Sequence, residues 1–134
     1  MSKYVIVEVD MTDGDCIKDA LKNLGYQCEE HQEAQQLEGF EGKMREQTAH
    51  IIVRRKYVNG ASNDVGFKKN KNGKYDLLIS DYDKSNRKTK VDFLEKLQQG
   101  YGASKVKKQI KSMGMTVLSQ KTDNKGRLRI RVMA

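Results

Sequence analysis

Short stretches of alternating apolar and polar residues predict β-strands that bury one face. The two faces of a first strand over residues 4–9 are Val5, Val7 and Val9, and Tyr4, Ile6 and Glu8. The core face of a later strand is Ala49, Ile51 and Val53, and its other face is His50, Ile52, Arg54 and Lys56. Between them, residues 26–33 predict a polar edge strand, and residues 34–47, rich in Glu, Gln and Gly, predict an exposed loop or a frayed helix.

Two stretches have the spacing of amphipathic helices. The first begins after a cap at Thr12 or Asp13 and ends at Gly25. Its predicted buried residues are Ile17, Ala20, Leu21 and Leu24. The second covers residues 90–113 and contains Gly100 and Gly102, which predict a bend, so we expect two helical pieces that meet at an angle.

Two β-hairpins flank the second helical stretch. Residues 64–80 turn at Asn72-Gly73, a pair that predicts a type I′ turn with positive φ at both residues. Residues 115–132 turn at 123–126, and Arg127, Arg129 and Arg131 alternate there with Leu128, Ile130 and Val132. Residues 81–89 predict a charged, flexible connection.

The resulting order, β-α-β-β followed by β-β-α-α-β-β, predicts an α+β fold. We expect a two-layer sandwich with a largely antiparallel sheet and helices on one face, and the ferredoxin-like topology is the nearest common template. The 134 residues fit a single domain over residues 1–134. No apolar run is long enough to span a bilayer and the first residues do not form a signal peptide, so we expect a cytoplasmic protein with no membrane contact.

Several segments resemble a known family. They are DVGFKKNKNGKYDLLISDYD (64–83), FLEKLQQGYGASKVKKQIKSMGMTVLSQKT (93–122), GRLRIRV (126–132) and LKNLGY (21–26). They are similar to an uncharacterised domain-of-unknown-function family of hypothetical reading frames of algal plastids and cyanobacteria, with bacterial and phage relatives. The resemblance implies no established activity, but some members lie beside genes for AAA-type ATPases, which implies a protein-assembly context. Members often carry tryptophan after the central hairpin and near the C-terminus, whereas this chain has none and offers Tyr82 in the first of these regions.

Candidate catalytic and metal-binding residues are few. Cys28 and His31 form a half-site that Cys16 and His50 would complete around zinc, but the spacing matches no common finger, and two reduced thiols and two surface imidazoles are the simpler interpretation. Cys16 near a helix start would suit a nucleophile, but no His is placed beside it by the sequence.

Five aspartates cluster after predicted strands, where they would suit Mg²⁺, although helix capping explains them more simply: Asp10, Asp13, Asp15, Asp81 and Asp83. No Walker A, GxGxxG, HExxH or GxSxG pattern occurs. We therefore expect a protein that is not an enzyme and needs no metal or cofactor.

Charge is the strongest functional signal. Residues 1–66 carry a net charge of −4 and residues 67–134 a net charge of +12. Such an excess attracts polyanions. The basic candidates are Arg127, Arg129 and Arg131 on the last strand, Arg54 and Lys56 on another, and Lys105, Lys107, Lys108 and Lys111 on the second helix. Arginines about 7 Å apart on an open sheet face would follow phosphates, and Tyr4 would stack on a base.

Two other functions remain open from the sequence. An acidic first half, a basic second half and apolar Leu37, Phe40 and Met44 in a predicted loop would suit a protein-interaction module, either as a homo-oligomer or on a larger assembly such as an AAA-type ATPase or a host protein bound by a phage-type factor. A basic pocket would suit sequestering of a nucleotide or small molecule. Binding of an anionic partner, nucleic acid above all, is the leading prediction.

Overall fold

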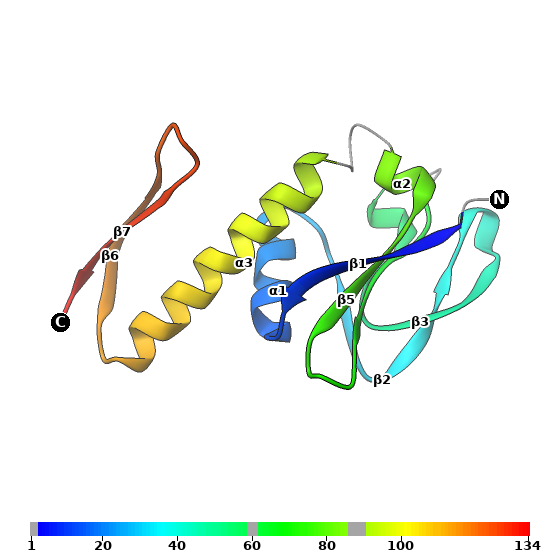
Figure 1. The fold of residues 1–134 in the computed structure, drawn as a ribbon, viewed down its shortest axis with the longest axis horizontal. Coiled ribbons are helices and arrows are strands. Elements are labelled where there is room, and N and C mark those ends of the chain that lie inside the picture. The colour runs from blue at the N-terminus through cyan, green and yellow to red at the C-terminus, as the bar shows by residue number, and fades with distance from the viewer. Residues whose placement is uncertain (1–2, 59–61, 86–90) are drawn as a thin grey trace.

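The structure of the protein is a computed structural model that describes residues 3–58, 62–85 and 91–134 (Figure 1). Its strands are β1 (Tyr4–Met11), β2 (Glu29–Glu38), β3 (Met44–Val53), β4 (Val65–Lys69), β5 (Tyr75–Ser80), β6 (Thr116–Thr122) and β7 (Leu128–Met133). Its helices are α1 (Gly14–Asn23), α2 (Asp81–Ser85) and α3 (Val91–Ser112), with 3₁₀ turns at Phe40–Gly42 and Arg55–Tyr57. The predicted α+β class is confirmed. None of the helices in the described ranges combines the length and apolar composition that a bilayer span requires.

Five strands form one antiparallel sheet in the order β1-β5-β4-β3-β2. Strands β2 to β5 follow one another as a meander, and β1 joins at the far edge, where Tyr4 lies opposite Ser80. The ferredoxin-like template shares the two layers and the antiparallel sheet but not this strand order, because β2 to β5 form a meander here and β1 is an edge strand. Strands β6 and β7 form a separate hairpin.

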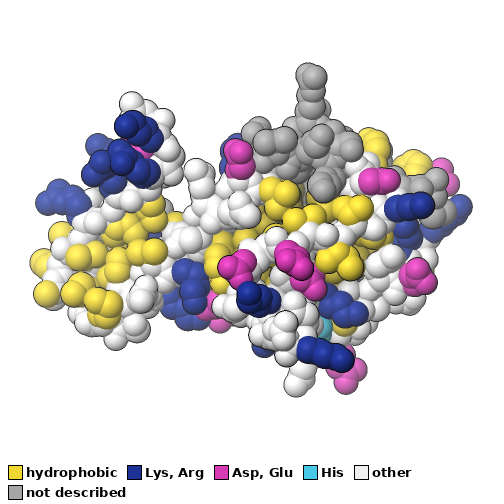
Figure 2. All heavy atoms as spheres, in the orientation of Figure 1, with side chains coloured by type: hydrophobic (Ala, Val, Ile, Leu, Met, Phe, Trp, Pro, Cys, Tyr) yellow, Lys and Arg dark blue, Asp and Glu magenta, His cyan; other side chains and the backbone are white. Residues whose placement is uncertain are grey.

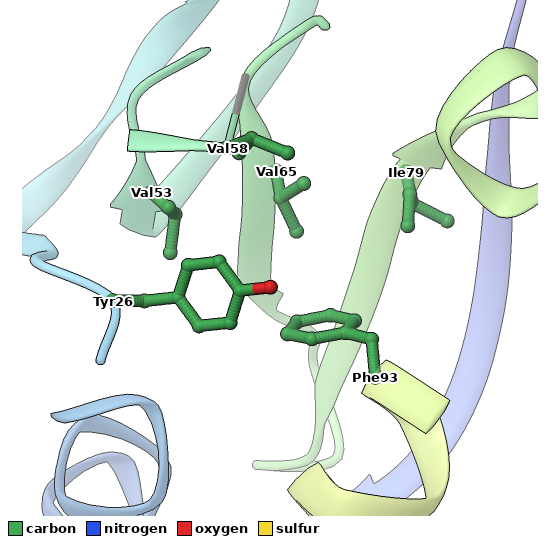
Figure 3. A pocket seen from close by; sticks show the side chains of 6 residues that line it. All are labelled: Tyr26, Val53, Val58, Val65, Ile79 and Phe93. Atoms are coloured by element: carbon green, nitrogen blue, oxygen red, sulfur yellow. The ribbon is translucent and has the colours of Figure 1, made fainter. Parts of the chain in front are cut away.

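The main core lies between this sheet and the helices α1 and α3. Asp13 caps α1 by accepting hydrogen bonds from the backbone of Asp15 and Cys16, and the helix buries Ile17 and Leu21 against the sheet. At one end of this core, the rings of Tyr26 and Phe93 meet edge to face with centroids 5.4 Å apart. They enclose a gap of about 10 Å³ with four aliphatic side chains, Val53, Val58, Val65 and Ile79 (Figure 3). A gap so small and apolar is a packing defect of the core, not a ligand site.

The second face of the sheet is covered in part by the long hairpin of β2 and β3. Leu37 of β2 is fully buried there with Ala49, Ile52 and Leu78. The loop or frayed helix predicted for residues 34–47 is therefore wrong, because cross-strand pairing and the burial of one leucine are sufficient to order a polar edge strand. Ile52 lies on the face opposite Ile51 and Val53, as predicted, and is buried there. The prediction that Ala49 shares the face of Ile51 is wrong, because the register of β2 and β3 is irregular between Glu30 and Gln35 and Ala49 is buried with Ile52.

The two predicted hairpins are present, but the first turn differs in detail. Gly73 has φ of 79° and donates its N–H to the carbonyl of Asn70, whereas Asn72 does not have positive φ. The turn is therefore not type I′. Part of the connection predicted as flexible, residues 81–89, forms α2, and residues 86–90 lie outside the described residues.

Helix α3 is continuous over 22 residues, so the predicted bend is wrong (Figure 1). Gly100 serves the crossing of two helices instead: a Cβ added there would lie 3.1 Å from the Cβ of Ala20 on α1. Tyr101 follows, and its hydroxyl accepts hydrogen bonds from the backbone N–H groups of Thr12 and Asp13 at 2.9 and 3.0 Å. The first half of α3 is thereby fixed to the start of α1, and the second half continues beyond the sheet.

Candidate anion-binding surface

The last part of the chain projects from the body of the protein. We call residues 103–134 the C-terminal arm; it consists of the second half of α3 and the hairpin β6–β7, which lies on the far side of α3 from the five-stranded sheet (Figure 1). The arm contains nine Lys and Arg residues and one acidic residue, Asp123, so it carries +8, which equals the net charge of the whole chain. The remaining residues are neutral in sum. The positive charge is therefore a property of the arm alone.

Pairing of β6 with β7 places the cations of the hairpin on its outer face. Lys121 lies opposite Arg129 and Ser119 lies opposite Arg131, while Leu128 of the inner face borders α3. Because side chains alternate along a strand, Arg129 and Arg131 of β7 point to the same side as Lys121. Arg127 was expected on the strand but lies in the turn just before it, where it shares Oδ2 of Asp123 with Arg129 and so extends the same face. The side chains of Arg127 and Arg129 are 63% and 67% exposed. Figure 2 shows Lys and Arg side chains gathered at the outer end of the hairpin.

Asp123 fixes the turn that joins the two strands. Its Oδ1 accepts hydrogen bonds from the backbone N–H groups of Lys125 and Arg127, both at 2.9 Å. Its Oδ2 lies 3.1 Å from Nε of Arg127 and 3.5 Å from Nε of Arg129. The backbone N–H of Arg127, together with these partners, lowers the pKa of the Asp123 carboxyl. Within the described residues, Arg131 and Lys121 have no ion pair.

The lysines of α3 face a different direction. Lys107, Lys108 and Lys111 line a groove of about 600 Å³ between α1, α3 and β6. Asp15 and Asp19 of α1 line the same groove, and Nζ of Lys108 lies 2.6 Å from Oδ2 of Asp13. This hydrogen bond from Lys108 lowers the pKa of the Asp13 carboxyl. Cations and carboxylates thus share the groove. Lys105, which is exposed, is not among the residues that line it.

Arg54, Lys56 and Tyr4 are not brought together with the hairpin. Arg54 lies 2.7 Å from Oδ2 of buried Asp64 and 2.6 Å from Oε1 of Glu29, so its guanidinium is held by two carboxylates. The hydroxyl of Tyr4 donates to the carbonyl oxygen of Asp64 at 2.7 Å. Lys56 is exposed but lies in a 3₁₀ turn after β3, with Nζ 5.0 Å from the centre of the Tyr57 ring. The expectation of a strand face shared by Arg54 and Lys56 is wrong, since β3 ends at Val53.

Asp64 belongs to a buried polar cluster that the sequence did not indicate. Its carboxylate accepts hydrogen bonds at 2.7 Å from the backbone N–H groups of Glu38 and Arg55 as well as from Arg54. The side-chain amide of neighbouring Asn63 accepts from the N–H of Phe40 and donates to the hydroxyl of Ser80. These contacts tie the tip of the β2–β3 hairpin to the start of β4 and the end of β5. The cluster is therefore buried for a structural reason, because it fastens these three segments to one another.

The other candidates for chemistry have separate partners. Nε2 of His31 lies 2.9 Å from Glu29, and Nδ1 of His50 accepts the N–H of Lys69. Burial and nearby Lys68 and Lys69 lower the pKa of His50. In the part of the chain that the structure describes, no three His, Cys, Asp or Glu side chains are arranged to hold a metal ion. Among the predicted acids, Asp13 is the helix cap, and Asp10 is paired with Lys74 at 2.8 Å.

Lys121 is the one member of the outer face that sequence reasoning missed. The signal was present, because the turn at 123–126 fixes which residues of the two strands face each other. With Thr122 paired to Leu128, Lys121 must lie opposite Arg129. Lys121 could have been predicted by pairing the two strands around the turn, and not by reading the last strand alone.

Comparison with known proteins adds one finding. A family model described as a protein of unknown function (DUF1257) matches residues 20–131. The matched region extends from within α1 through the body and includes almost all of the arm. No curated protein and no solved structure gives a significant match.

Proposed function

Because the chain belongs to DUF1257, a family of unknown function, we propose a function from its own surface: it is a non-enzymatic binding protein for an anionic macromolecule, nucleic acid, which it binds through the C-terminal arm. One observation carries the proposal. Lys121, Arg127, Arg129 and Arg131 share the exposed outer face of a hairpin, with Asp123 as the only acidic residue of the arm.

The geometry of this face suits a phosphate backbone. Residues two apart on a strand are separated by about 7 Å, as Arg129 and Arg131 are. Arg127 extends this row at the turn, and Lys121 broadens it across the hairpin. Each phosphate that such a cation neutralises releases condensed counterions, which makes binding favourable and dependent on salt. The simpler account is that charges on an isolated hairpin maintain solubility and prevent edge pairing. The solubility account does not require the cations to gather on one face of the hairpin. It also predicts no ligand whose binding depends on salt.

The test is a fluorescence-anisotropy titration with labelled RNA and DNA, single- and double-stranded, across a series of salt concentrations. We compare the protein with the Arg127→Ala, Arg129→Ala, Arg131→Ala triple variant. The matched control removes the same charge from the body at three exposed lysines, Lys22, Lys43 and Lys71. The arginine variant should bind more weakly, and its log–log salt slope should shrink by about one to three. Equal losses in both variants, or no binding by the protein, would contradict the proposal.

A second candidate function, a protein-interaction module, is favoured by the apolar surface of the same arm. Five large hydrophobic side chains of the arm are at least 40% exposed: Val106, Met113, Leu118, Val132 and Met133. Figure 2 shows hydrophobic side chains gathered over the hairpin. Exposed apolar side chains that gather in one patch mark sites of protein contact, whereas scattered single ones need no explanation. A defined oligomer in light scattering, lost in the Leu118→Ser, Val132→Ser double variant, would support this second function.

A further inference from the structure

We infer that the anionic partner is double-stranded DNA and that the hairpin β6–β7 enters its major groove as a two-stranded ribbon. This inference rests on the proposed function and specifies its ligand. Three properties of the arm support it: its lack of aromatic residues, its shape, and the chemistry of its outer face.

The arm has no aromatic side chain. Tyr101 is the last aromatic residue of the chain, and its hydroxyl is bound to the backbone of Thr12 and Asp13. Proteins that hold single strands stack the exposed bases on aromatic rings, at about 1–3 kcal/mol per base. Tyr4 is the predicted stacking residue, but its hydroxyl is bound to the carbonyl oxygen of Asp64. Its ring is also occupied, because the guanidinium of Arg45 lies 4.8 Å from the ring centre. A cationic surface without a stacking platform fits a duplex, whose bases are already stacked.

The shape of the hairpin distinguishes between duplexes. Among the described residues, its strands of seven and six residues pair with each other alone, so the ribbon is about 20 Å long and two strands wide. The major groove of B-form DNA, about 12 Å wide, admits such a ribbon. The major groove of A-form RNA is too narrow and deep for side chains to reach the bases. The hairpin also projects from the body and lies apart from the five-stranded sheet, with α3 between them (Figure 1).

The outer face offers hydrogen-bond donors where major-groove base edges offer acceptors. Arginine donates two parallel hydrogen bonds to O6 and N7 of guanine, and lysine contacts the same atoms. Arg131 and Lys121 are not engaged in ion pairs in the described structure, so they reach a groove without losing an internal partner. Arg127 and Arg129 are oriented by Asp123, which limits how deeply they enter. We therefore assign base contacts to Arg131 and Lys121, and phosphate contacts to Arg127, Arg129 and, at the exposed turn, Lys125.

The experiment compares five unlabelled competitors, four nucleic acids and heparin, against a labelled DNA duplex at one salt concentration. The nucleic acids are the same duplex, one of its strands alone, the RNA duplex of the same sequence, and a DNA duplex whose cytosines carry 5-glucosyloxymethyl groups that fill the major groove. Heparin is the non-nucleic polyanion. The unmodified duplex should compete at least about tenfold better than each of the others. The Arg131→Ala variant should lose about tenfold in affinity for the duplex, and the Lys43→Ala control should lose none.

The outcomes separate the two proposals. No binding to any nucleic acid would overturn both. Equal or tighter binding to single strands or to duplex RNA would overturn the choice of DNA duplex and leave the anion-binding function standing. A duplex with a filled groove that competes as well as the open one would overturn the placement of the ribbon. Both single-residue variants lie at exposed positions, and unchanged circular dichroism of each confirms that the comparison is made between folded proteins.

Discussion

Gly100 of α3 lies directly against Ala20 of α1, so closely that an added Cβ would be 3.1 Å from the Cβ of Ala20 and 3.4 Å from its Cα. Ala20 is fully buried, and α1 is held from the other side by the sheet. The glycine therefore sets the distance between the two helices. Glycine weakens an isolated helix, but at position 100 it allows α3 to pack closely against α1.

Replacement of this glycine separates packing from helix propensity. Gly100→Ala should lower the free energy of unfolding by about 1 kcal/mol, because a close contact costs about 1–3 kcal/mol and the helix gains about 1. Gly102→Ala is the matched control: nothing lies within 4 Å of its Cβ position, so this variant should gain about 1 kcal/mol. Urea unfolding measures both. Equal gains at the two positions would mean that the helices do not touch at Gly100.

The hydroxyl of Tyr101 joins the arm-bearing helix to the start of α1. Tyr101→Phe removes the acceptor for the N–H groups of Thr12 and Asp13, and we expect a loss of about 1 kcal/mol in the free energy of unfolding. Tyr82→Phe, at an exposed tyrosine, should change it by less than about 0.5 kcal/mol. Amide hydrogen exchange gives a second reading, since the N–H of Asp13 should exchange faster in the first variant only. Unchanged exchange there would count against the contact.

Asp64 should be the most sensitive position in the body. Asp64→Ala leaves the N–H groups of Glu38 and Arg55 and the guanidinium of Arg54 without their common acceptor, and we expect a loss of about 3–5 kcal/mol. Glu46→Ala removes an exposed carboxylate from β3 and should have an effect within about 0.5 kcal/mol. Thermal and urea unfolding measure the difference. A loss below about 1 kcal/mol for Asp64→Ala would show that the cluster is not a fastening.

The stability of the body should decline in alkali through Tyr4. Burial, assisted by the nearby charge of Asp64, raises the pKa of Tyr4 above its ordinary value of about 10. The folded state therefore favours the neutral phenol. The contribution of Tyr4 to the free energy of unfolding is fully present below about pH 10, and it is lost as the pH rises further and the unfolded chain ionises. Urea unfolding of the protein and of Tyr4→Phe should show a stability gap that narrows above about pH 10. A constant gap would contradict the burial of the phenol.

Local rules accounted for most elements of the fold. Alternation in residues 4–9, the cap at Asp13 and the glycine turns depend on neighbours in the sequence, and the structure contains each of them. The errors arose where distant residues decide. Residues 34–47 contain few apolar side chains, yet β2 is ordered because Leu37 is buried under a strand that follows much later in the chain. The bend predicted at Gly100 failed for the same reason, since Ala20 lies eighty residues earlier.

The candidate surface was predictable only in part. The alternation of arginine along the last strand indicated their common face without knowledge of the rest of the fold. Arg54 was grouped with them because its strand partner was unknown, and nothing local indicates that Asp64 and Glu29 converge on its guanidinium. Charge in a sequence shows how many cations exist. Which of them are already neutralised depends on contacts that only the folded chain supplies.

The edge position of β1 has a consequence for the speed of folding. The body of the protein closes only when Tyr4 meets Ser80 and Asp13 meets Tyr101, which lies 88 residues away. These contacts therefore have a high loop-closure cost. The hairpin of the arm pairs strands that are adjacent in sequence. Closure of the body should therefore limit the folding rate of the whole chain. Substitutions on the outer face of the hairpin should leave that rate unchanged, so this face is free to vary in sequence without slowing the appearance of the folded protein.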